Sequence, residues 1–86
     1  MSKIKAQVLD AENAVLDVAD KAWDKVKSDL PLVWNPKVQP NYVERFIANV
    51  VHLLKEKGHP LAESEAVGFA AYRYVMEEIY GYDLDS

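Results

Sequence analysis

His52 and Glu56 are the pair of residues whose types and spacing best suit metal chemistry, because they lie four positions apart. On a helix this spacing places both side chains on one face, where they can begin a zinc site. A zinc site needs three or four ligands, however, and the chain has no cysteine and only one other histidine. That histidine, His59, follows the expected helix end at Gly58. We therefore expect a solvent-exposed ion pair here, with no metal and no other cofactor.

The other residues that can support catalysis are carboxylates, serines and glycines. Glu77 and Glu78 adjoin each other, but adjacent helical positions point in different directions, so they do not form the paired carboxylates of a hydrolase, and Glu63 does not complete them. No serine has a base that the sequence identifies. The three glycines are too scattered to form a phosphate-binding loop. We expect no enzymatic activity and no catalytic residues.

The segment from Leu53 to Ala66 has a rhythm seen in helix-turn-helix DNA-binding proteins. A helix that reads DNA offers Arg, Lys, Asn or Gln to the base edges. The helix that follows this segment offers Arg73 and several glutamates instead. Nucleic-acid binding is therefore one alternative function, and a small-ligand pocket lined by the aromatic residues is another.

Charge is distributed unevenly over the 86 residues, whose formal net charge is −4. Residues 60–86 carry six carboxylates against the single base Arg73, a balance of −5. Residues 31–59 carry four bases against two carboxylates, a balance of +2. The acidic third suits a basic protein partner, although a solvated face that also attracts the middle of the chain explains it more simply.

The composition is that of a single globular domain spanning residues 1–86, because 50% of the residues are hydrophobic and 28% are charged. No apolar run reaches the roughly 20 residues of a membrane span. The charged start Met1–Ala6 is not typical of a signal peptide. The lack of cysteine is compatible with a reducing compartment. We expect a cytoplasmic protein.

Residues 3–28 are predicted to form a long first helix. Its apolar stripe follows three-and-four spacing and comprises Ile4, Val8, Ala11, Val15, Val18, Ala22 and Val26. Leu9, Leu16 and Trp23 broaden the stripe at sevenfold spacing. At 1.5 Å per residue this helix is roughly 37 Å long, against roughly 24–28 Å for the later helices, so it overhangs them. Either a second copy covers the overhang, with Val8 and Val15 in the contact, or the helix stays within its own bundle.

Residues 29–40 are predicted to form an ordered crossover, because three prolines exclude a continuous helix. Its apolar side chains are expected to lie on the bundle and close one end of the core: Leu30, Leu32, Val33, Trp34 and Val38. Trp34 is either a plug of the core or a hot spot for binding.

A second helix is predicted at about residues 42–57. Asn41 and Glu44 have the spacing of a capping box at its start, and Gly58 suits its end. The short turn at His59 and Pro60 predicts that helices 2 and 3 form an antiparallel hairpin.

A third helix is predicted at about residues 62–80, and it is apolar on two faces. The face expected in the core comprises Leu61, Gly68, Phe69, Tyr72, Val75, Met76, Ile79 and Tyr80. Val67, Ala70 and Tyr74 lie on the opposite face and are our candidates for contact with a partner, with Trp34 second. Whether Tyr74 is a core or an interface residue stays open. Gly68 is expected to allow a close approach by another helix.

These elements predict an all-α fold, a three-helix bundle with a long first helix, a proline-rich ordered crossover and a helix 2–3 antiparallel hairpin. The function we expect is that of a small non-catalytic protein–protein interaction module that binds through apolar helix faces as a homodimer. An adaptor, an inhibitor, an immunity protein or an assembly factor fits these features equally well.

Overall fold

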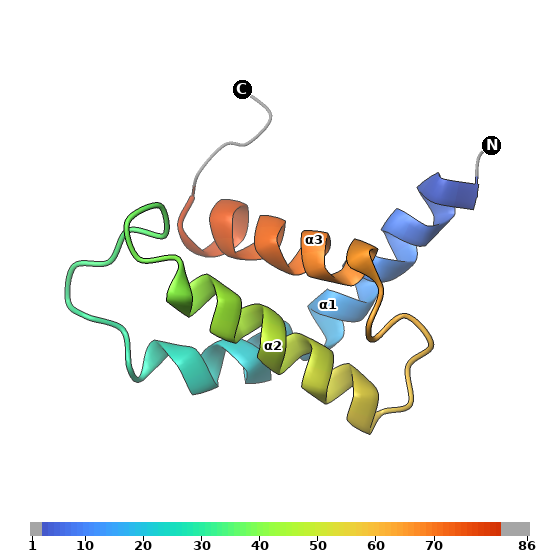
Figure 1. Ribbon diagram of the computed structural model, residues 1–86, viewed down its shortest axis with the longest axis horizontal. Helices are drawn as coiled ribbons and strands as arrows, with labels where there is room; N and C mark the ends of the chain where they lie inside the picture. The colour runs from blue at the N-terminus through green and yellow to red at the C-terminus, as the bar shows by residue number, and fades with distance from the viewer. Residues whose placement is uncertain (1–2, 82–86) are drawn as a thin grey trace.

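The computed structural model describes residues 3–81, with side chains from residue 9 onward, and the regular secondary structure in this part of the chain is all helical (Figure 1). Helix α1 spans Lys3–Lys27, α2 spans Asn41–Glu56 and α3 spans Glu65–Arg73. A π-helical segment, η1, continues α3 over Tyr74–Ile79. The three helices pack against one another, which confirms the prediction of an all-α fold with three packed helices.

Helix α1 contributes buried residues to the core along most of its length, from Ala11 to Val26. Five residues of the predicted stripe are buried between α2 and α3: Ala11, Val15, Val18, Ala22 and Val26. Ala14 and Ala19 are buried beside them, and these small side chains let α2 and α3 pack close to α1. The stripe is therefore used within the chain over this range, and Leu9 and Leu16 remain exposed beside it. The first turns of α1 project beyond the other helices (Figure 1).

Helix α2 begins without the predicted capping box. Pro40 already has helical backbone angles (φ −70°, ψ −13°), and no side chain caps the helix. The Glu44 N–H donates to the Pro40 carbonyl at 3.0 Å, so Asn41 lies inside the first turn and cannot act as the cap. A proline suits the start of a helix because its φ is preset. The buried face of α2 comprises Val43, Phe46, Val50 and Leu54, and Gly58 follows the helix end with a positive φ of 69°.

Helix α3 begins at Glu65 because the Ser64 hydroxyl accepts a hydrogen bond from the Val67 N–H at 3.2 Å. Its core face is the opposite of the predicted one in this part of the helix. Val67, Ala70 and Ala71 are buried, whereas Phe69 and Tyr72 are exposed. The predicted close approach at Gly68 is also wrong, because no atom of another helix lies within 4 Å of the position that a Cβ would occupy.

The π-helical segment changes the register of this helix after Arg73. The Tyr80 N–H donates to the Val75 carbonyl at 2.9 Å, a bond between residues five apart. An α-helix rotates by about 100° per residue, and the wider π turn rotates by less. Val75 and Met76 are therefore buried as predicted, and Ile79 packs against the core, while Glu78 remains at the surface.

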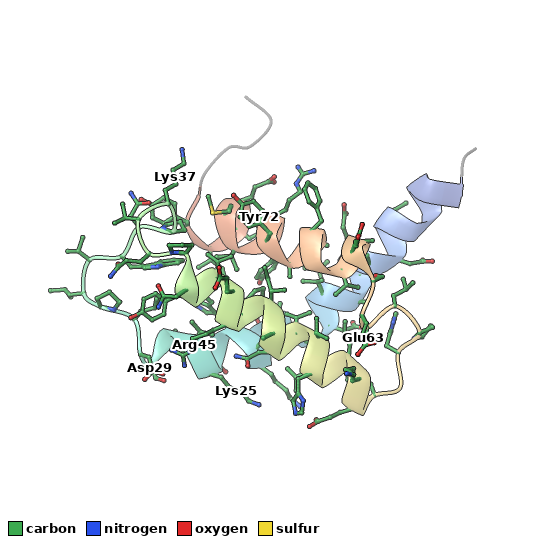
Figure 2. The ribbon with its side chains drawn as sticks, in the orientation of Figure 1. Lys25, Asp29, Lys37, Arg45, Glu63 and Tyr72 are labelled. Atoms are coloured by element: carbon green, nitrogen blue, oxygen red, sulfur yellow. The ribbon has the colours of Figure 1, made fainter. Side chains whose placement is uncertain are left out.

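The crossover contacts the helices through two of its side chains, Asp29 and Trp34. Asp29 pairs with Arg45 of α2 at 2.7 Å (Figure 2). Trp34 lies 5.7 Å from Trp23 of α1 and 5.9 Å from Tyr80, measured between ring centroids. Of the other apolar side chains that were predicted to lie on the bundle, Leu30 is half-buried, and the remaining three do not lie there. Leu32, Val33 and Val38 are exposed, and Trp34 is the crossover side chain that enters the aromatic cluster.

Candidate functional site

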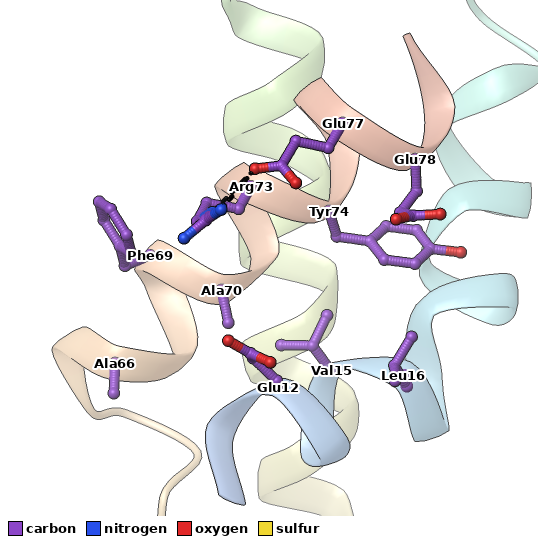
Figure 3. A pocket seen from close by; sticks show the side chains of 10 residues that line it. All are labelled: Glu12, Val15, Leu16, Ala66, Phe69, Ala70, Arg73, Tyr74, Glu77 and Glu78. Carbon is purple, nitrogen blue, oxygen red and sulfur yellow. Dashed lines mark hydrogen bonds and ion pairs between the residues drawn. The ribbon is translucent and has the colours of Figure 1, made fainter. Parts of the chain in front are cut away.

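A groove of about 480 Å³ runs between α1 and α3 and continues along η1 (Figure 3). We call it the α1–α3 groove. Six apolar or aromatic side chains line it: Val15, Leu16, Ala66, Phe69, Ala70 and Tyr74. Val15 and Ala70 are buried, whereas Leu16 and Phe69 are exposed on the two walls. The groove stays open because α3 presents two small residues here, Ala66 and Ala70, four positions apart.

The polar side chains of the groove are three carboxylates and one guanidinium: Glu12, Glu77, Glu78 and Arg73. The Arg73 Nε and Nη2 both donate to Glu77 Oε1, at 2.9 and 2.7 Å. This ion pair neutralises one of the three carboxylates, so the residues that line the groove carry a formal net charge of −2. Figure 3 shows Glu12 on the α1 side and Glu78 near Tyr74.

Tyr74 links the groove to the core. Its ring stacks on Phe46 of α2, with centroids 5.8 Å apart and planes 10° apart. Burial raises the pKa of its hydroxyl above the ordinary value, and the charges of Asp20 and Glu78 raise it further. The carboxylates on both sides thus give the inner end of the groove a negative potential.

A second hollow, of about 380 Å³, lies between α1 and the turn after α2. Asp10, Asp17 and His59 are among its lining residues. The His59 Nδ1 accepts a hydrogen bond from the Leu61 N–H at 3.1 Å, so this side chain supports the turn. The hollow has fewer apolar walls than the α1–α3 groove and is the weaker candidate for binding.

The candidate contact residues from the sequence have mostly become core residues. Val67, Ala70 and Val15 are buried. Tyr74 and Trp34 are half-buried and pack against the core. Val8 lies outside the residues whose side chains are described. The structure brings Val15, Ala70 and Tyr74 together along the groove, and it places Val67 and Trp34 elsewhere.

Sequence reasoning missed two exposed apolar residues of the groove, Leu16 and Phe69. Leu16 was marked only by the sevenfold repeat that broadens the apolar stripe of the first helix. A single α-helical register through residue 80 predicts that Phe69 lies in the core, and the structure does not keep that register after Arg73.

Metal and membrane sites are not found in the described part of the chain. Across residues 3–81, no three His, Cys, Asp or Glu side chains gather closely enough to hold a metal ion. His52 and Glu56 lie 2.8 Å apart, and both are exposed. Over the same residues, no helix combines the length and the apolar character that crossing a bilayer requires.

Comparisons with known proteins identify no relative of this chain. No known protein family matches the chain, and searches of curated proteins and of solved structures give no significant match. The functional argument therefore rests on the geometry and chemistry of the groove.

Proposed function

We propose that this chain is a small non-catalytic protein-binding module, and that its α1–α3 groove receives the apolar face of a partner segment. The observation that carries the proposal is the pair Leu16 and Phe69, which stand exposed on opposite walls of a hollow whose floor is apolar. Exposed apolar side chains that gather at a concave surface are typical of binding sites. An adaptor, inhibitor, immunity or assembly role is compatible with such a groove.

Binding would be driven by removing apolar surface from water. Fully burying a Leu or Phe side chain contributes about 1.5–3 kcal/mol. Leu16 and Phe69 are therefore the expected hot spots of the groove, and the buried Val15 and Ala70 shape its floor. The ion pair between Arg73 and Glu77 is half-buried and joins two residues of the same wall, so these two charges already satisfy each other before a partner binds.

The test uses displayed helical peptides of fifteen residues, the length of Glu65–Ile79, which forms one wall. One face of each peptide is apolar, and its flanking positions carry Lys or Glu with equal frequency. Binders selected on the wild-type chain are then measured by fluorescence anisotropy on two variants. In the groove variant, Leu16 and Phe69 are both changed to Ala. In the control variant, Leu9 and Tyr72 are changed to Ala.

The control matches the test in helix and in exposure. Leu16 is 59% exposed and Leu9 is 56% exposed, both on α1, while Phe69 at 64% and Tyr72 at 40% share α3. Neither control residue lines the groove. We expect the groove variant to bind selected peptides at least about tenfold more weakly, and the control variant to bind them nearly as well as the wild type. If every binder tolerates the groove variant, the groove is not the binding site.

The second candidate is self-association through the crossover, and one observation favours it. Leu32 is fully exposed, and Val33 and Val38 are exposed near it, although all three are apolar. A second copy of the chain would cover these side chains in a homodimer. Light scattering after size-exclusion chromatography, over a wide concentration range, tests this proposal. A dimer that becomes a monomer when Leu32 and Val33 are changed to Ser supports it, and a monomer at all concentrations excludes it.

A further inference from the structure

We propose that the partner segment of the α1–α3 groove is a basic amphipathic helix, apolar on one face and carrying Lys or Arg along the edges of that face. This inference rests on the groove docking proposed above and names the chemistry of the occupant. Three features of the chain lead to it: the charge of the groove lining, the absence of a sheet edge in the described residues, and the charge of the chain itself.

The charge of the groove lining calls for a cationic partner. Among the described residues that line the groove, Arg73 is the one base, and Glu77 already binds it. Glu12 and Glu78 are exposed, stand at the groove, and form no ion pair with any described residue. Burial is the main cause of the raised pKa of the Tyr74 hydroxyl, and the charges of Asp20 and then Glu78 raise it further, which agrees with carboxylates near this end of the groove. A partner with Lys or Arg beside its apolar face would complement both carboxylates.

The geometry of the groove favours a helix over an extended peptide. One common mode of binding an extended peptide adds it as a strand to a sheet edge, which supplies its backbone hydrogen bonds. Residues 3–81 contain no strand, so this part of the chain offers no such edge. A helix satisfies its own backbone hydrogen bonds and needs only side-chain contacts. The groove has lining side chains from both α1 and α3, so a helix laid between these two walls would contact both (Figure 3).

The charge of the chain disfavours a second copy as the occupant of this groove. The whole chain carries −4. Two copies that met face to face through the groove would bring Glu12 and Glu78 of each against the same acidic lining of the other, and like charges across an interface oppose binding. Self-association through the crossover, by contrast, would leave the groove free.

The peptide selection described above also tests this inference, by a separate readout. Among binders that the groove variant weakens, we expect Lys to exceed Glu clearly at the flanking positions. Their affinity should fall as salt rises, because exposed charges are screened. Changing Glu12 and Glu78 to Gln should weaken Lys-flanked binders about three- to tenfold at low salt. A matched control, Glu44→Gln with Asp17→Asn, removes the same charge outside the groove and should change binding by less than about twofold.

The possible failures are distinguishable. Binders that depend on the groove but carry Glu as often as Lys overturn the basic helix and leave the groove function standing. Equal weakening by both charge variants shows that Lys is preferred only because the chain is acidic overall, and this too overturns the inference. A dimer that the Leu16 and Phe69 substitutions convert to a monomer would make a second copy the occupant. A lack of groove-dependent binders would overturn the function itself.

Discussion

Tyr74 of η1 and Phe46 of α2 lie face to face, with ring centroids 5.8 Å apart and planes only 10° apart. Phe46 is fully buried and also meets Trp23 of α1 edge to face, at 6.0 Å. The Tyr74 ring therefore covers the centre of the core on one side and lines the groove on the other. Through this one side chain, the stability of the fold and the shape of the groove depend on each other.

We predict that Tyr74→Ala lowers the free energy of unfolding by about 2–3 kcal/mol, because it removes a ring that packs on the core. Tyr72→Ala, on the same helix, is the control and should cost less than about 1 kcal/mol because Tyr72 is exposed. Urea denaturation followed by circular dichroism measures both values. Equal losses for the two variants would contradict the stacking of Tyr74 on Phe46.

Alkaline pH should destabilise the fold partly through Tyr74. Its hydroxyl has a raised pKa in the folded chain, chiefly because of burial and then because of Asp20 and Glu78. An unfolded tyrosine releases its proton near pH 10, before the folded one does, so rising pH favours the unfolded state. The stabilisation is complete below about pH 10 and is lost as pH rises through the folded pKa.

Urea denaturation at several pH values between about 9 and 11 tests this prediction. Tyr74→Phe keeps the aromatic ring and removes the ionisable hydroxyl. The variant should therefore lose less stability than the wild type over this pH range. Parallel curves for the two proteins would show that Tyr74 does not contribute to the pH dependence.

The core face of α1 could be predicted from the sequence because it depends on a regular local pattern. Val15, Val18 and Ala22 follow three-and-four spacing, and a regular α-helix turns that spacing into one face. The same reasoning failed for α3. An α-helical register through residue 80 places Phe69, Tyr72 and Ile79 on one face, but the π-helical turn after Arg73 lets only Ile79 reach the core.

The groove could not be predicted from the sequence because its two walls come from helices about fifty residues apart in the chain. The spacing of apolar residues along one helix does not determine how far apart α1 and α3 lie in the folded chain. The residue that caps a helix is also difficult to predict from sequence. Asn41 and Ser64 both suit a helix start, yet Ser64 alone caps one, since Pro40 already begins the turn before Asn41.

Gly68 offers a site at which the fold can be stabilised. It lies inside α3, where glycine costs up to about 1 kcal/mol relative to alanine, and a Cβ there would meet nothing within 4 Å. We predict that Gly68→Ala raises the free energy of unfolding by about 0.5–1 kcal/mol in urea denaturation. Gly58→Ala should lower it by about 1 kcal/mol, because Gly58 has a positive φ of 69°. A loss of stability in Gly68→Ala would instead indicate the close helix contact that the sequence suggested.

Trp34 should hold the crossover in place, whereas its exposed neighbours should not. Its ring contacts those of Trp23, Tyr42 and Tyr80, and its Nε1 donates to the Gln39 carbonyl at 3.2 Å. We predict that Trp34→Ala lowers the free energy of unfolding by about 2–4 kcal/mol.

Two further variants separate the contributions at the crossover. Trp34→Phe keeps an aromatic ring but loses the hydrogen bond to Gln39, and it should cost about 1 kcal/mol beyond any loss of packing. Leu32→Ala should change the stability by less than about 0.5 kcal/mol, because Leu32 is fully exposed and contributes nothing to the core. Urea denaturation of the three variants at low protein concentration compares them without self-association. If Leu32→Ala costs as much as Trp34→Ala, the crossover lies on the bundle as the sequence predicted, and Leu32 is then not free to meet a second copy of the chain.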